Sequence, residues 1–199
     1  MTKKIKILIP LILVSLSLFG CTGKQTLDEN GNNIGVKVCD YKNIDLTQNK
    51  DKENTSEYIM QYLLDNTQYN DYSQEDIDKY IEDSKKYYEE YAALMGVDYE
   101  TYIKDYVKQT PEDFEKEIKK SAINYVKEKD ILSTIANKEN IEFTNEDYDN
   151  YLNEMLQYTY YNSLDDFKNS IIEKDEVDEM KEVAYFDKIL KYLEKENSK

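Results

Sequence analysis

From about residue 54 onward, apolar side chains recur every three or four positions, which is the spacing of one face of an α-helix. Four of these segments follow a serine or threonine that has an aspartate three positions later. A hydroxyl at the N-cap and an acid in the first turn both stabilise the start of a helix. The four pairs are Ser73 with Asp76, Thr110 with Asp113, Thr144 with Asp147, and Ser163 with Asp166. The pattern therefore predicts helices that begin directly after these caps.

The apolar positions also predict where each helix runs. The first helix is expected to end at Gly96, after about 22 residues, because glycine readily closes a helix C-terminus. Pro111 stands at the first position of the second helix, where its missing N–H costs nothing. A short amphipathic piece at 57–64 precedes them, and the last segment allows a break near Lys174. We expect an all-α fold of about six helices.

The apolar stripes of these helices are expected to form the core. After Ser73 the stripe is Ile77, Tyr80, Ile81, Tyr87, Tyr88, Tyr91, Leu94 and Met95. After Thr110 it is Phe114, Ile118, Ala122, Tyr125, Val126, Leu132, Ile135 and Ala136. After Thr144 it is Tyr148, Tyr151, Leu152, Met155 and Tyr158, and after Ser163 it is Phe167, Ile171, Val177, Val183, Phe186, Leu190 and Leu193.

The N-terminus has the features of an export signal. Three lysines precede an apolar run at 7–19, which is about two-thirds of the roughly 20 residues that span a bilayer as a helix. A charged start followed by a short apolar stretch is typical of a signal peptide rather than a membrane anchor. Leu18, Phe19, Gly20 and Cys21 resemble the lipobox of bacterial lipoproteins, although Phe19 is bulkier than usual. This resemblance implies lipidation at Cys21; an ordinary signal peptide with an incidental thiol is the alternative.

The region between the signal and the helices is polar. We expect residues 1–20 to be a lipoprotein signal peptide, 21–53 a lipidated N-terminus and tether, and 54–199 a helical domain. Within the tether, Ile34, Val36 and Val38 alternate with other residues, which indicates a short strand or hairpin. Two acylated chains hold a protein firmly at a membrane. The mature chain is therefore expected to be extracytoplasmic and tied to the cell membrane by its first residue.

Composition argues against several classes of function. The chain has 26 lysines and 42 acidic residues, a net charge of −16, which makes nucleic acid an improbable partner. It has no histidine, so the commonest general base and metal ligand are missing, and two cysteines are too few for a zinc site. There is no phosphate-binding motif for ATP. We therefore expect no catalytic residue, no metal and no cofactor; carboxylate pairs are too numerous to be informative.

Several motifs, taken in order, resemble one family. "IANKENIEFTNEDYDNYLNEM" at 135–155 and "GVDYETYIKDYVKQTPEDFEKEIKKSA" at 96–122 resemble the C-terminal helical domain of trigger factor, which shares its architecture with SurA-type and PrsA-type foldases. "DYKNIDL" at 40–46 resembles the segment that leads into that family's isomerase domain. Here only about ten residues, 47–56, occupy the place of the isomerase, and the basic ribosome-docking loop is absent. The resemblance, over residues 56–196, implies an extended, multi-helix chaperone domain without the catalyst.

Tyrosine and methionine on the helices suggest how such a domain could bind clients. Both side chains suit a surface that meets varied partners, because tyrosine has a flat apolar face and methionine adapts its shape. The alternative is that most of them pack helix against helix. The candidate client-binding residues are Tyr87, Tyr88, Tyr91, Met95, Tyr99, Tyr102, Tyr106, Met155 and Tyr158.

The sequence therefore favours a membrane-anchored, ATP-independent chaperone, or holdase, that assists the folding of exported proteins. Its expected partners are unfolded or nascent exported polypeptides. One alternative is a surface scaffold lipoprotein that holds a single dedicated partner. The other is a protein that the family would label a peptidyl-prolyl isomerase, although the catalytic domain is missing.

Overall fold

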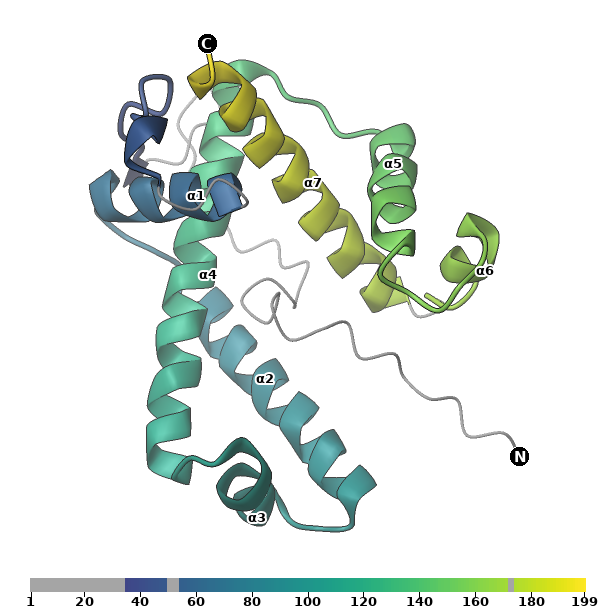
Figure 1. The fold of residues 1–199 in the computed structure, drawn as a ribbon. Helices are drawn as coiled ribbons and strands as arrows, with labels where there is room; N and C mark the ends of the chain where they lie inside the picture. The colour runs from purple at the N-terminus through teal and green to yellow at the C-terminus, as the bar shows by residue number, and fades with distance from the viewer. Residues whose placement is uncertain (1–34, 50–53, 172–173) are drawn as a thin grey trace. The chain divides into compact units, whose positions relative to one another are not determined.

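The computed structural model describes residues 35–49, 54–171 and 174–199 (Figure 1). The predicted signal peptide, Cys21 and much of the predicted tether lie outside the described residues. The described chain divides into two compact units. The smaller unit is Phe143–Tyr185, and the larger unit is residues 35–142 together with Phe186–Lys199. We describe each unit by itself.

The larger unit contains the N-terminal elements, the two longest helices before residue 142 and the end of α7. Its elements are β1 (Val36–Lys37), a 3₁₀ turn (Leu46–Gln48), α1 (Thr55–Asn66), β2 (Gln68–Tyr69), α2 (Gln74–Met95), α3 (Tyr99–Tyr102), a π-helical turn (Ile103–Val107), α4 (Pro111–Glu139) and the C-terminal half of α7 (Lys174–Asn197). Helices α2 and α4 pack side by side, and α3 connects them at one end (Figure 1). This hairpin of helices presents the candidate surface described below.

The smaller unit contains α5 (Asn145–Leu156), α6 (Leu164–Lys168) and the N-terminal half of α7. Helices α5 and α6 pack against each other. Its core is formed by Tyr148, Tyr151, Leu152, Phe167 and Ala184. The described chain is therefore mostly helical, and the predicted all-α fold class is confirmed.

The predicted helix starts are confirmed. Each N-cap hydroxyl accepts a hydrogen bond from the backbone N–H of the predicted aspartate, at 3.1 Å for Ser73, 3.1 Å for Thr110, 3.2 Å for Thr144 and 3.1 Å for Ser163. At Thr144 the aspartate side chain also accepts a bond from the N-cap N–H, which completes a capping box. Gly96 closes α2 with φ 73°, a left-handed conformation that glycine adopts without strain.

The last predicted stripe is divided between α6, which ends at Lys168, and α7, which begins at Lys174, in agreement with the break allowed there. Two other details differ from the prediction. Helix α5 ends at Leu156, so Tyr158 lies in the following turn rather than on the helix. On α2 the buried face stops at Ala92, and Leu94 is 72 % exposed, so the end of that stripe does not belong to the core.

The short strand predicted near residue 36 is present and pairs with a segment that the sequence did not predict as a strand. Val36 lies opposite Tyr69 and Lys37 opposite Gln68 in an antiparallel pair. Gly35 extends the contact by accepting a 2.7 Å hydrogen bond from the N–H of Asn70. Val36 is buried, and β1 also contacts α4. This pairing holds the N-terminal segment against the helices.

Candidate functional site

The α2–α4 hairpin carries a connected series of aromatic rings at one end. We call residues 87–106 the arm tip; it contains the end of α2, the turn at Gly96, α3 and most of the π-helical turn. The Tyr87 ring lies 4.7 Å from that of Tyr91 and 5.4 Å from that of Tyr88, between ring centroids. Tyr102 continues the series, 6.5 Å from Tyr88 and stacked at 5.3 Å on Tyr106. The structure thus brings five of the predicted tyrosines together.

Burial divides these side chains into two groups. Tyr88, Tyr99 and Tyr102 are partly buried against a small core made by Ile103, Phe114 and Ile118. Tyr88 also meets the Phe114 ring edge-on at 4.7 Å. These three rings pack inside the hairpin of α2 and α4. For them, the alternative prediction, that the tyrosines pack helix against helix, is correct.

The second group faces solvent. Tyr87 is 39 % exposed, Tyr106 52 % and Met95 55 %, and neighbouring Leu94 is 72 % exposed. A soluble surface seldom gathers several large apolar side chains unless they meet a partner. The exposed part of the arm tip is therefore the candidate binding surface.

Local backbone features fix the position of this surface. After Gly96 the carboxylate of Asp98 accepts a 3.0 Å bond from the N–H of Thr101 and so caps α3. The fully buried Ile103 anchors the π-helical turn, and Lys108, with φ 67°, ends it in the left-handed conformation. The chain can then enter α4 at the Thr110 cap.

The arm tip is built for contact rather than for proton chemistry. Burial raises the pKa of Tyr88 and Tyr99, and burial together with a hydrogen bond to Tyr91 raises that of Tyr87. These phenols therefore stay neutral at physiological pH. In the described part of the chain, no group of side chains has the composition and spacing of a metal site.

The two remaining predicted residues belong to the smaller unit. Met155 is half-buried and packs against the core of that unit. Tyr158 is 68 % exposed, and its backbone N–H donates to the carbonyl of Met155 at 3.0 Å. Met155 therefore serves packing, and Tyr158 remains an accessible ring outside the arm tip.

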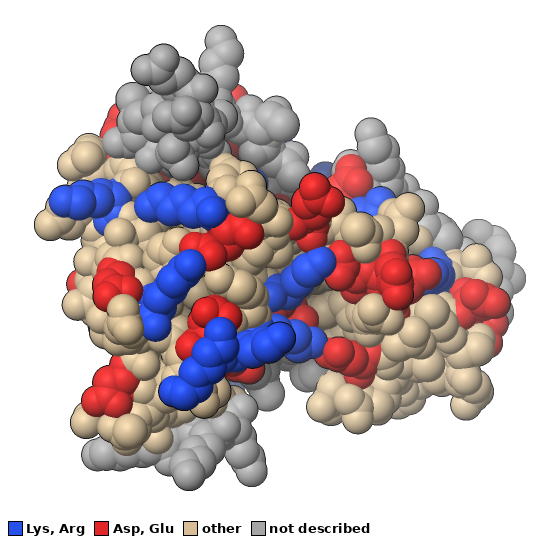
Figure 2. Space-filling view, turned by 90° about the horizontal axis from the view of Figure 1, so that it is seen from above, with Lys and Arg blue, Asp and Glu red and all other residues tan. Residues whose placement is uncertain are grey.

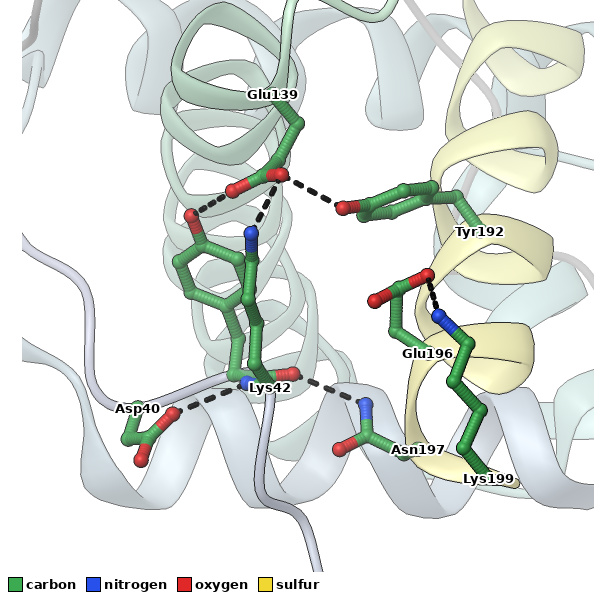
Figure 3. Close-up of polar contacts among 8 residues, drawn as sticks. Asp40, Lys42, Glu139, Tyr192, Glu196, Asn197 and Lys199 are labelled. Atoms are coloured by element: carbon green, nitrogen blue, oxygen red, sulfur yellow. Dashed lines mark hydrogen bonds and ion pairs between the residues drawn. The ribbon is translucent and has the colours of Figure 1, made fainter.

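Apart from the arm tip, the larger unit contains a polar site that joins the N-terminal segment to its helices. Glu139, the last residue of α4, accepts bonds from the hydroxyls of Tyr41 and Tyr192, each at 2.6 Å. Its other contact is an ion pair with the Lys42 Nζ at 2.7 Å (Figure 3). We call this group the Glu139 cluster. It connects residues 41–42, α4 and the end of α7.

Asn197 adds a second link between the same elements. Its side-chain nitrogen donates to the carbonyl of Tyr41 at 3.0 Å (Figure 3). Its side-chain oxygen accepts from the N–H of Ile44 at 2.7 Å. Ile44 is 4 % exposed. Residues 41–44 are thus an integral part of the larger unit, fastened through side chains that are about one hundred or more positions away in sequence.

Comparison with known proteins places this geometry in a family. The model of the bacterial trigger factor (TF) C-terminus matches residues 46–195, well over half of the chain. The chain belongs to this family. The matched range includes the whole arm tip as well as Glu139 and Tyr192. The predicted resemblance to the trigger factor C-terminal domain is confirmed; the lipoprotein character and the SurA-type or PrsA-type relationship stay predictions.

Individual relatives agree with the family assignment. A trigger factor from Caldanaerobacter subterraneus subsp. tengcongensis is 36 % identical over 94 residues, which is 47 % of this chain and 21 % of that protein. Trigger factors from Thermoanaerobacter sp. (strain X514) and Thermoanaerobacter pseudethanolicus are each 36 % identical over 93 residues, or 46 % of this chain and 21 % of theirs. The matched segment thus spans about a fifth of each relative. No solved structure matches the chain.

Sequence reasoning missed some residues of this trigger factor C-terminal domain. Leu94 was assigned to the core stripe, but it directly precedes Met95 at the end of α2, beyond the last buried residue. Tyr160, 91 % exposed, was not singled out. The proximity of Glu139 to Tyr192 had no local signal, because 53 residues separate them.

Among the described residues, no helix has the length and apolar character needed to cross a bilayer.

The Glu139 cluster predicts an acid-sensitive contribution to stability. The Lys42 ammonium and the two tyrosine hydroxyls lower the pKa of Glu139 to about 2. Because this folded-state pKa lies below the ordinary value of about 4.3, the contribution is complete above that pH and is lost as the pH falls toward 2. Allowing for screening by solvent, we expect about 1–2 kcal/mol.

The measurement is the free energy of unfolding of wild type and Glu139→Gln at pH 6 and pH 2.5. The variant should be less stable at pH 6, and the difference should shrink at pH 2.5. Glu142→Gln is the control, since Glu142 is exposed and only three positions away. A difference that stays constant across this pH range would contradict the prediction.

Proposed function

We propose that this trigger factor C-terminal domain is a membrane-anchored, extracytoplasmic holdase that shelters apolar segments of newly exported chains. The observation that carries the proposal is the exposed arm tip, where Leu94, Met95, Tyr87 and Tyr106 face solvent. The curated relatives are named trigger factors, and the matched segment spans about a fifth of each. A domain that binds without catalysing fits both observations.

Energetics favour weak and reversible binding. Covering about 400 Å² of apolar surface gives roughly 10 kcal/mol gross at about 25 cal/mol per Å². Association and ordering cost about 4–15 kcal/mol, so little net affinity remains. Clients would then leave without ATP, which is consistent with a location outside the cytoplasm.

The proposed location rests on the sequence alone. Lysines, a short apolar run and Cys21 follow one another at the N-terminus. Lipidation at Cys21 would fasten the chain to the cell membrane, and the polar residues that follow would let the helical domain reach nascent chains. Labelling cells with a radioactive fatty acid tests this point: wild type should carry label and Cys21→Ser should not.

The chaperone activity is tested with the chain from residue 21 onward carrying Cys21→Ser. It should suppress aggregation of an unfolded model protein at near-stoichiometric ratio without ATP. Normal helicity with no suppression would overturn the proposal. Crosslinking in cells separates it from the scaffold alternative: many exported proteins should be captured, whereas one dominant partner would favour the scaffold.

A further inference from the structure

The smaller unit contains a hollow that the proposed function does not use. Its volume is about 410 Å³, and it lies between the start of α5, the end of α6 and the first half of α7. We call it the Lys181 hollow. It is lined by Asn145, Tyr148, Asp149, Lys168, Ile171, Val177 and Lys181. Four of these side chains are polar or charged and three are apolar or aromatic, so the hollow offers both charge and some apolar contact to a ligand.

The two lysines of the hollow differ in their pairing. Lys168 is neutralised, because its Nζ lies 2.5 Å from the carboxylate of Asp149. Lys181 lies over the Tyr148 ring, 5.7 Å from its centroid. Within the described residues, no carboxylate lies within ion-pairing distance of Lys181. The lining therefore carries one uncompensated positive charge.

An uncompensated lysine is unexpected in this chain. Acidic residues outnumber lysines by 42 to 26, and several lysines elsewhere pair with carboxylates, as Lys85 does with Glu115 at 2.9 Å and Lys191 with Asp187 at 2.8 Å. On the face seen in Figure 2, lysine side chains lie among acidic ones. A cation beside apolar walls attracts an anion more strongly than one in open water, because the local dielectric constant is lower.

We propose that the Lys181 hollow binds a carboxylate carried by an apolar polypeptide segment. The carboxylate would pair with the Lys181 ammonium. An adjacent apolar side chain would cover the half-buried Ile171 and Val177. The source of the carboxylate is either the C-terminus of a chain or an aspartate or glutamate between apolar residues, since both present the same chemistry. The site is in the smaller unit and does not depend on the arm tip.

The experiment measures peptide binding by NMR titration of the chain from residue 21 onward with Cys21→Ser. The probes are acetyl-Phe-Leu with a free carboxylate, the same peptide as its C-terminal amide, and acetyl-Leu-Glu-Leu-amide. The free acid should shift backbone signals of residues that line the hollow, and the amide should bind about tenfold more weakly. If the internal glutamate peptide matches the free acid, a side-chain carboxylate is the source; if it binds like the amide, the C-terminus is.

Lys181→Met tests the charge while keeping a long apolar stem. The variant should lose the preference for the free acid, so that acid and amide bind alike. Lys195→Met, an exposed lysine near the end of α7, is the matched control and should keep the preference. Equal binding of acid and amide to wild type, no binding of either carboxylate peptide, or an unchanged preference in Lys181→Met would overturn the proposal. None of these outcomes bears on the arm tip, so aggregation assays test the proposed function separately.

Discussion

A variant with serine at Leu94, Met95 and Tyr106 is expected to lose nearly all of its ability to suppress aggregation. These three side chains are 72 %, 55 % and 52 % exposed, so their apolar surface is available to a client. Each contributes about 1.5–3 kcal/mol when it is fully buried against a partner. Removing the three takes away about 4 kcal/mol or more, which lowers affinity roughly 10³-fold. Binding that is already weak would then be undetectable.

The same variant should fold normally, which makes the result specific. Its changed residues lie outside the small core of Ile103, Phe114 and Ile118, so helicity and melting temperature should stay close to wild type. The matched control is Tyr160→Ser together with Tyr72→Ser, two exposed tyrosines outside the arm tip. The assay is light scattering of an aggregating model protein at equal molar ratios. Equal suppression by the variant and the control would rule out the arm tip as the client-binding surface.

The helix boundaries of this chain were predictable because their causes are local. A hydroxyl and an acid three residues apart satisfy the first N–H groups of a helix whatever the rest of the chain does. The caps at Ser73, Thr110 and Thr144 and the closure at Gly96 all follow this rule. The break in the last stripe near Lys174 was also visible, because Ile171 and Val177 are six positions apart, which does not keep them on one helix face.

The exposure of tyrosines could not be read from the sequence. A tyrosine ring suits both a core boundary and a wet surface, so helical spacing alone does not distinguish the two. Tyr88 and Tyr87 are neighbours, yet the first packs on Phe114 while the second is 39 % exposed. The difference depends on where α4 lies against α2, which is a tertiary fact.

Long-range polar contacts were also beyond local reasoning. The family resemblance pointed to "DYKNIDL" and to Glu139 separately, and the structure joins them through Tyr41 and Lys42. Nothing in the spacing of these residues indicates the contact, because 98 positions separate Tyr41 from Glu139. The predicted boundary between tether and domain at residue 53 stays a prediction. The described part of that tether nevertheless packs into the larger unit, through Val36 and Ile44.

Replacing Glu128 with glutamine is expected to stabilise the protein at pH 8 by about 2–3 kcal/mol. Glu128 lies on α4, and burial raises its pKa to about 7. Burial, with a smaller contribution from the Glu128 charge, raises the pKa of Tyr80 on α2 to about 12. A buried carboxylate without a compensating cation costs free energy when it ionises. Glutamine keeps the shape and removes that cost.

The sign of the pH dependence follows from the raised pKa. Below about pH 4.3 Glu128 is neutral in both the folded and the unfolded chain, so wild type and variant should be equally stable there. As the pH rises from about 4.3 to 7, wild type loses stability, because the unfolded chain releases the proton while the folded chain still holds it, and above about pH 7 the loss levels off. Urea unfolding at pH 5 and pH 8 should therefore show a gain for Glu128→Gln that is small at pH 5 and large at pH 8. Glu89→Gln, an exposed glutamate on α2, should show no such gain. If Glu128→Gln were less stable at pH 8, Glu128 would instead have a favourable partner in the folded protein, and burial alone would not describe its environment.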